Sequence, residues 1–424
     1  MNLNPHLVIR PEARGALAFN PDNAETVYLD REGLSFIRDV LTRNFRSGGF
    51  PLSDFLSLRK SEILTDNGGL SGQAIGLIDS LLDSRIPEIQ NSLSVPETLH
   101  LALTNTCDQV CAGCFYSKGK ADADVFMSAD LFERILDQAA EHRVFQFAFG
   151  GGEPLLHPRI ADFVKKSRQR NVVPNITTNG NRLTLELARE LKESGLGQIQ
   201  ISLDAADENL NGKTRPNHAA ALRAVAACRK TGLRFGINAL ITRRNFRKLP
   251  ALVTLCEKTG AAGINLLRPK PPVLASGWLE KVSLNSEDNL RFHDMLRKIT
   301  RKNTIPVTLD QSLSFLAFHR APDELYRSGV WGCGAGRRFL TIDPSGTVYP
   351  CSHFREPVGV DGDFILAWKS AATLDEFRNL EHNMNGHCRG CRMLNVCRGC
   401  RAVVKELGGD FVDPDPHCPL KVRR

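Results

Sequence analysis

The sequence predicts an α/β fold built from six strand–helix units. From residue 98 to about residue 310, short segments rich in Val, Ile, Leu and Phe alternate with longer segments whose apolar residues recur at helical spacing. The short segments are apolar almost throughout, which is typical of parallel strands covered by helices. Six units are fewer than the eight of a closed barrel, so a partial barrel and a doubly wound sheet both fit. The expected strands are residues 98–104, 144–151, 173–180, 198–204, 234–242 and 263–269; the expected helices are 128–143, 157–170, 183–195, 218–232, 246–260 and 287–300.

Single residues support several of these helices. Ser128 is a suitable N-cap for the first, and Gly195 is a suitable end for the third. The helix at 246–260 is expected in spite of Pro250. Cys228 and Cys256 fall on helices among apolar residues, where a reduced cysteine commonly belongs to the core.

Residues 1–95 have a different pattern and are expected to form a separate small unit. Short strands precede two helical segments, which suits an α+β module that resembles a winged helix. A linker rich in Ser and Pro then leads into the core domain at residues 96–310. The expected strands are residues 6–11, 15–19 and 26–30, and the expected helices are 33–45 and 73–84.

Residues 311–424 form the third expected domain. The regular pattern ends near Trp331, and Cys, Gly and Pro dominate the rest, apart from a predicted strand pair at 338–344 and 347–351. Such a segment has few core residues, and metal centres could supply the missing stability.

Bulk properties favour a cytoplasmic protein that binds neither nucleic acid nor a membrane. The formal charge of +8 is spread along the chain without a basic block that alternates with aromatic residues. No apolar run approaches the roughly 18 residues of a membrane span, and the first residues lack the core of a signal peptide. In a reducing compartment, twelve cysteines indicate metal binding rather than disulfides.

Three of these cysteines, Cys107, Cys111 and Cys114, follow the first predicted strand of the core domain. Ligands of βα folds gather at the carboxyl ends of strands. Three thiolates can hold three irons of a [4Fe–4S] cluster and leave the fourth iron open to a cofactor or substrate. A zinc site and reduced core cysteines are the alternatives, although zinc with three cysteines usually adds a His, and this loop has none.

The spacing CxxxCxxC, followed by Phe115 and Tyr116, resembles the signature of the radical S-adenosylmethionine (radical SAM) superfamily. That resemblance implies a partial (β/α)6 barrel, and SAM bound to the open iron and cleaved to a 5′-deoxyadenosyl radical. Segments at the ends of later strands resemble the family's GGEP, TNG and SLD elements and its carboxylate-binding Arg and adenosine-flanking strand. The SAM contacts implied are Gly151, Gly152, Glu153, Thr178, Asn179, Ser202, Asp204, Arg215, Asn238 and Leu240.

Apart from Cys228 and Cys256, the remaining seven cysteines lie from Cys333 to Cys418 and could supply two further metal centres. Pairs of zinc-ribbon type are the alternative. The spacing resembles the SPASM extension of radical SAM enzymes, with two residues instead of the usual three between Cys397 and Cys400. The resemblance implies two auxiliary [4Fe–4S] clusters, and thus three clusters in all. The first would be held by Cys333, Cys351 and Cys400, and the second by Cys388, Cys391, Cys397 and Cys418.

The resemblance implies a maturase that removes hydrogen from a precursor-peptide side chain, with crosslinking or oxidation as the outcome. Ser352 stands where sulfatase maturases have an Asp after the second SPASM cysteine, which argues against that activity. Residues 27–41 resemble winged-helix modules that bind leader peptides, by adding the peptide to a sheet edge. A flavodoxin or ferredoxin would supply electrons. The alternatives are modification of a tetrapyrrole or other small molecule, and a non-catalytic metal-binding adaptor.

Overall fold

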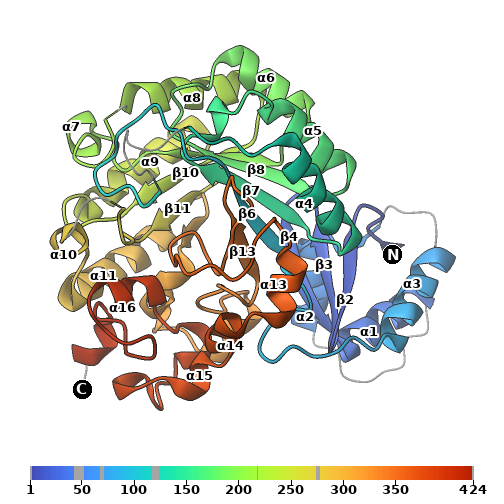
Figure 1. Cartoon of the computed structure of the whole chain (residues 1–424). Helices are drawn as coiled ribbons and strands as arrows, with labels where there is room; N and C mark the ends of the chain where they lie inside the picture. The colour runs from blue at the N-terminus through green and yellow to red at the C-terminus, as the bar shows by residue number, and fades with distance from the viewer. Residues whose placement is uncertain are drawn as a thin grey trace.

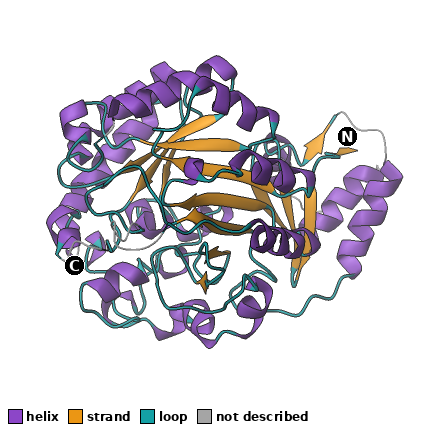
Figure 2. Cartoon of the chain, turned by 45° about the horizontal axis from the view of Figure 1, so that its top comes forward, coloured by secondary structure: helices purple, strands orange, loops and turns teal. Residues whose placement is uncertain are grey.

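The structure is a computed structural model, and it describes residues 2–42, 52–66, 71–116, 124–216, 218–273 and 277–422. Within these residues no helix is both long and apolar enough to cross a membrane. The chain forms a central curved sheet with helices outside it, a small N-terminal unit at one side, and a C-terminal region beside the sheet (Figures 1 and 2).

The central sheet contains seven parallel strands in chain order, which decides between the two predicted arrangements. Strand order runs β12-β11-β10-β9-β8-β7-β6 without the reversal that defines a doubly wound sheet. The sheet stays open, so it is a partial barrel, as predicted. The strands are β6 (Thr98–Thr104), β7 (Gln146–Gly151), β8 (Val173–Thr178), β9 (Gln198–Ser202), β10 (Phe235–Leu240), β11 (Ile264–Leu267) and β12 (Val307–Leu309). The last of these is a seventh strand that the sequence pattern did not predict.

The helices that connect the strands cover one face of the sheet. Ser128 caps the first, because its hydroxyl accepts a hydrogen bond from the Leu131 N–H at 3.1 Å. Pro250 falls in the first turn of its helix, where the missing N–H costs nothing. Cys228 and Cys256 are buried in the core, as predicted. The helices are α4 (Ala129–Glu141), α5 (Ile160–Gln169), α6 (Leu185–Glu193), α7 (Glu208–Asn211), α8 (His218–Thr231), α9 (Leu249–Thr259), α10 (Trp278–Val282) and α11 (Ser286–Lys302).

The two faces of the sheet differ in chemistry. Ile199 and Ile201 belong to the core beneath the helices, while Gln198 and Gln200 alternate with them along β9. Asn238 and Asn265 are paired neighbours on β10 and β11. The face away from the helices therefore carries amide side chains, although the strands were expected to be apolar on both sides.

The C-terminal strand pair joins the core sheet. Strand β13 (Phe339–Ile342) lies parallel to β6, and β14 (Val348–Tyr349) pairs with β13 in the antiparallel direction. The remaining C-terminal helices are short, as expected for a region with few apolar residues. They are α12 (Pro322–Arg327), α13 (Phe364–Ser370), α14 (Ala372–Arg378), α15 (Leu380–Asn383) and α16 (Arg401–Glu406).

The N-terminal unit has the predicted α+β composition. Its three-stranded antiparallel sheet has the order β2-β3-β4, and a two-stranded pair, β1 with β5, was not predicted. Residues 43–45 of the predicted helix 33–45 lie outside the described residues. The strands are β1 (Asn2–Leu3), β2 (Val8–Glu12), β3 (Gly15–Asn20), β4 (Glu25–Asp30) and β5 (Leu64–Thr65); the helices are α1 (Arg31–Thr42), α2 (Leu52–Lys60) and α3 (Ser71–Asp83).

Strands β2 and β3 attach this unit to the core domain. Phe19 stacks on Phe145 with ring centroids 5.1 Å apart. The buried Arg10 pairs with Glu12 and donates to the carbonyls of Val95 and Pro96. These contacts join apolar packing to a satisfied buried ion pair, so the unit has one defined position on the core.

We expect Phe19→Ala to lower the free energy of unfolding by about 3–5 kcal/mol, since it leaves a cavity in a fully buried interface. Leu366→Ala, at a side chain 62% exposed, is the control and should change stability by less than about 0.5 kcal/mol. Thermal and urea unfolding measure both. Equal loss in the two variants would contradict the role of Phe19.

Candidate active site and iron–sulfur centres

The loop after β6 carries Cys107, Cys111 and Cys114 at the carboxyl edge of the sheet. Three N–H groups point at two of the sulfurs. The Gln109 amide donates to Cys111 Sγ at 3.0 Å, and the Arg215 guanidinium approaches the same sulfur at 4.0 Å. The Asn179 amide, from the end of β8, lies 3.8 Å from Cys107 Sγ. Such donors match thiolate ligands, which accept hydrogen bonds in iron–sulfur sites.

Burial favours the protonated thiols of Cys107 and Cys111 in the metal-free protein. It raises the pKa of Cys107 to about 12, and it also raises the pKa of Cys111. Iron binds thiolates, so a cluster placed here displaces these protons. The twelve cysteines, all within the described residues, form no disulfide.

Glycines let the end of β7 approach the cysteine loop. A Cβ added to Gly152 would lie 2.0 Å from the Thr106 carbonyl oxygen, and one added to Gly151, at φ +107°, would lie 2.5 Å from that of Thr104. The Gly152 N–H donates to the Thr104 carbonyl at 2.7 Å. No side chain fits at either position, so the loop that holds Cys107 rests directly on the backbone of β7.

Glu153 is fixed in this site by three hydrogen bonds. Its carboxylate accepts from the Thr178 hydroxyl at 2.7 Å, the Asn179 N–H at 2.8 Å and the Leu155 N–H at 3.1 Å. Burial raises the pKa of Glu153 to about 7, while these donors act in the opposite direction. The structure therefore brings Glu153, Thr178 and Asn179 together, as their order in the sequence suggested.

The ends of β9 and β10 meet at Asp204. Its buried carboxylate accepts from Arg215 Nε at 3.1 Å, from the Leu240 N–H at 2.8 Å and from the Thr214 hydroxyl at 2.6 Å. Ser202 and Asn238 are register partners on the two strands. Nine of the ten residues that the sequence suggested for SAM therefore lie at or near the carboxyl ends of four strands, β7 to β10. The tenth, Arg215, follows α7 and reaches the same edge through its contact with Asp204.

Two contacts near this site were not predicted. Gly113, at φ +74°, lies under the ring of Trp278, which a Cβ at that position would meet at 2.2 Å. Asn245 donates to the carbonyls of Asp204 and Leu240, at 2.9 and 2.7 Å, and so holds the two strand ends together. The glycine between two cysteines was the available signal for the first contact. A lone Asn has no signal in a single sequence.

Three of the C-terminal cysteines, Cys333, Cys351 and Cys400, pack in one cluster. Burial raises the pKa of Cys351 to about 12, and the thiols of Cys333 and Cys400 raise it further, so these three are neighbours. Burial also raises the pKa of Cys388 to about 12, with added contributions from Cys418 and Cys391.

Cys397 is the remaining cysteine of the second proposed group. Cys397 has its pKa raised by burial and by the thiols of Cys418 and Cys388. Among the described residues, no three Cys, His, Asp or Glu side chains converge on a single metal position. In a [4Fe–4S] cluster, each cysteine binds a different iron.

Comparison with known proteins identifies the family. Residues 101–255 match the Radical SAM superfamily, and residues 333–392 match SPASM, an iron–sulfur cluster-binding domain. The chain is 32% identical over 349 residues to mycofactocin maturase MftC of Mycobacterium tuberculosis (strain CDC 1551 / Oshkosh), which covers 78% of this chain and 85% of the relative. The chain belongs to the radical SAM superfamily.

Two further similarities support this assignment. PqqA peptide cyclase of Granulibacter bethesdensis is 26% identical over 342 residues, covering 78% of this chain and 89% of the relative. The crystal structure of Streptococcus suis SuiB bound to S-adenosylmethionine has the same fold, with a TM-score of 0.71 at 20% identity over 99% of this chain and 100% of that chain. The predicted partial barrel and cysteine-rich domain are confirmed. The protein is a radical SAM enzyme whose cofactors are iron–sulfur clusters and SAM.

We expect Gly152→Ala to lose most of the iron bound at Cys107, Cys111 and Cys114 and to reduce 5′-deoxyadenosine formation at least tenfold, because the new methyl group would displace the loop that carries Cys107. Iron bound by the C-terminal cysteines should remain. Gly150→Ala is the matched control. A Cβ at Gly150 meets no described heavy atom within 4 Å, so this variant should retain both the iron and the activity. Iron analysis and chromatography after anaerobic reconstitution measure the effects. Full activity of Gly152→Ala would show that the loop tolerates the shift.

Proposed function

We propose that this enzyme is a maturase that modifies a side chain of a precursor peptide, by crosslinking or oxidation. The similarity to mycofactocin maturase carries the proposal, because the two sequences are 32% identical over most of both chains. The relative named PqqA peptide cyclase and the SuiB structure bound to its precursor peptide SuiA point to the same class of substrate. Membership of an enzyme family removes the adaptor alternative. Modification of a tetrapyrrole or another small molecule is the remaining alternative.

The residues beside the first three cysteines fit SAM and its cluster. Cys107, Cys111 and Cys114 would bind three irons, and the loop that carries them is held against the backbone of Gly151 and Gly152. Glu153 Oε2 accepts one hydrogen bond, from Asn179, and keeps acceptor capacity for the SAM amino group. When bound, SAM supplies a 5′-deoxyadenosyl radical that takes a hydrogen atom from the substrate.

Asp204 has a different role from Glu153. Arg215, Thr214 and the Leu240 N–H already occupy its carboxylate. We infer that Asp204 holds Arg215, whose guanidinium would bind the SAM carboxylate. The other suggested contacts, Gly151, Gly152, Thr178, Asn179, Ser202, Asn238 and Leu240, would surround the rest of the cofactor.

We further propose three [4Fe–4S] clusters. Cys333, Cys351 and Cys400 would hold one auxiliary cluster with an open iron, and Cys388, Cys391, Cys397 and Cys418 would hold the other. These clusters would accept the electron released on product formation, or bind the peptide. A flavodoxin or ferredoxin would reduce the SAM cluster. A cytoplasmic location suits reduced thiols.

The N-terminal sheet offers one edge to a leader peptide. The edge of β2 is occupied, because Arg143 donates to the Ile9 carbonyl at 2.9 Å and Pro11 has no N–H. In the described part of the chain, β4 pairs with β3 alone. Tyr28 on β4 is 43% exposed. We propose that the leader adds to β4 as a further strand.

Reconstituted protein should contain about twelve irons, four for each cluster. Replacing Cys107, Cys111 and Cys114 by Ala should abolish 5′-deoxyadenosine formation and leave about eight irons. Cys228→Ala is the control, because this buried helix residue should bind no iron. About four irons together with two zincs would overturn the auxiliary clusters, and retained SAM cleavage in the triple variant would overturn the site.

The substrate proposal is tested with synthetic peptides that correspond to short reading frames beside the gene. A peptide substrate should lose hydrogen, measured as a mass decrease, in a reaction that depends on SAM and reductant. Tyr28→Ala should weaken peptide binding about fivefold, the effect of losing roughly 1 kcal/mol of cross-strand contact. Its SAM cleavage without peptide should stay at the wild-type rate. Turnover of a tetrapyrrole with no effect on any peptide would establish the alternative.

A further inference from the structure

The segment that leaves β11 carries two cations toward the C-terminal cysteines. Arg268 forms a bidentate ion pair with Asp415, with N–O distances of 2.6 and 2.7 Å, and both side chains are 3% exposed. Lys270 comes two residues later. Both basic residues belong to the core domain and reach partners in the last 115 residues of the chain, so this segment fixes the core to the auxiliary region.

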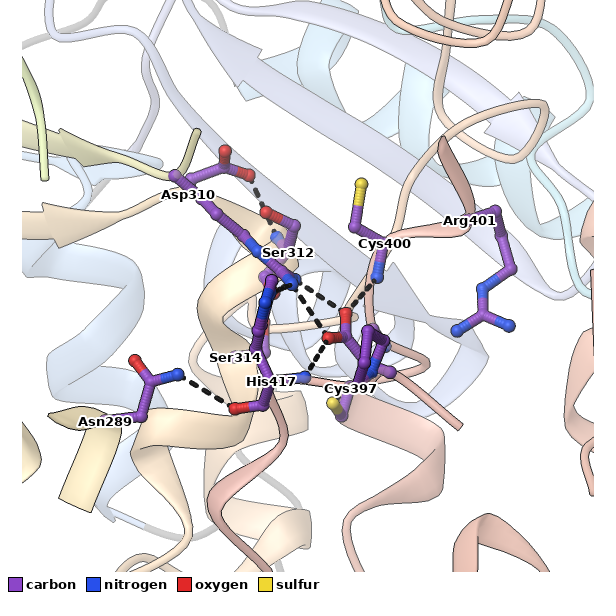
Figure 3. A network of polar contacts seen from close by, with 12 residues as sticks. Asn289, Asp310, Ser312, Ser314, Cys397, Cys400, Arg401 and His417 are labelled. Carbon is purple, nitrogen blue, oxygen red and sulfur yellow. Dashed lines mark hydrogen bonds and ion pairs between the residues drawn. The ribbon is translucent and has the colours of Figure 1, made fainter. Parts of the chain in front are cut away.

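Lys270 lies directly beside one of the two cysteine groups. Its ammonium donates to Cys400 Sγ at 3.7 Å and to the Ser312 hydroxyl at 2.6 Å, and it pairs with Asp310 at 3.0 Å. Figure 3 shows Asp310, Ser312 and Cys400 in one polar network. Burial opposes the charge, but Asp310 and Cys400 raise the pKa of Lys270, so the ammonium stays charged.

The first cysteine group has a cation beside it. Cys333 and Cys351 pack in the same cluster as Cys400, whose sulfur the Lys270 ammonium contacts. The Asp415 carboxylate accepts a hydrogen bond from the Cys400 N–H at 2.9 Å, but its charge is paired with that of Arg268. The first group also has three thiolates, and the second has four. A cluster with fewer thiolates and a cation at its sulfur is easier to reduce.

We propose that Lys270 raises the reduction potential of the centre held by Cys333, Cys351 and Cys400. The inference rests on the ligand set in the proposed function. Lys270 acts through the N–H···S contact and its charge, so it is a positioning residue and not a ligand. The centre takes up one electron as it passes from the 2+ to the 1+ state, and the fixed ammonium stabilises the charge that this electron adds.

Removing each partner of the Lys270–Asp310 ion pair in turn should shift the reduction potential of this centre in opposite directions. In anaerobic titration with dithionite followed by electron paramagnetic resonance, Lys270→Met should make this centre at least tenfold harder to reduce, a fall of 59 mV for one electron. Asp310→Asn should shift the potential upward, because it removes a negative charge and keeps the ammonium. A purely structural role would shift both variants in the same direction.

Further variants guard against misfolding and non-specific effects. Lys270→Arg keeps the charge and should stay near the wild-type potential. The double variant Lys270→Met with Asp310→Asn leaves no buried unpaired charge and should lie between the two single variants. Lys405→Met removes an exposed ammonium just beyond Cys400 and should shift nothing. The signal of the centre is assigned by its loss in Cys351→Ala.

The outcomes separate the two proposals. If Cys351→Ala loses four irons and Lys270→Met leaves the potential unchanged, the role of Lys270 is wrong and the ligand set stands. A shift of the same sign in Lys270→Met and Asp310→Asn would also overturn that role. If Cys351→Ala keeps all its iron, the proposed ligand set itself is wrong, and the inference falls with it.

Discussion

Strand β6 is the element on which the rest of the structure depends, because it pairs with a parallel neighbour on each side. On one side β7 brings the glycine backbone under the cysteine loop, and on the other side β13 connects the core to the auxiliary region. The loop after β6 holds Cys107, Cys111 and Cys114, while Cys333 precedes β13 and Cys351 follows β14. One set of ladder hydrogen bonds therefore fixes the first cysteine group and one auxiliary group relative to each other.

Side chains beyond the strands make this link more precise. The ring centroid of Phe115, next to Cys114, lies 4.3 Å from that of His353, two residues after Cys351. Arg355 donates a hydrogen bond to the Phe115 carbonyl. Arg268 and Lys270 add buried ion pairs from β11. Breaking a buried ion pair by removing one partner typically costs 3–5 kcal/mol, so these contacts hold one arrangement of the two domains even where they add little net stability.

Short-range patterns made most of the site predictable. Cysteine spacing is a property of a few adjacent residues, and the strand–helix alternation placed each motif at the same edge of the sheet. The proposed grouping of the C-terminal cysteines came from the resemblance to the SPASM extension. Long-range contacts had no such signal. The three-residue strand β12 is too short for a periodic pattern, and the pairing of β13 with β6 joins residues more than 200 positions apart. Lys270 lies in a Pro-rich segment, and its sequence context gives no signal of its contact with Cys400.

The open sheet and its amide face suit a polar substrate of some size. A closed eight-stranded barrel fills its interior with branched apolar side chains, whereas here β12 and β14 remain as separate edges. Asn175 Oδ1 and Gln200 Oε1 are buried and have no hydrogen-bond partner among the described residues. Both atoms are closed to solvent, so an internal donor such as a water, rather than a substrate, would satisfy them. The half-buried amides of Gln198 and Asn265 lie on the same face, and an amide both donates and accepts hydrogen bonds, as a peptide backbone does.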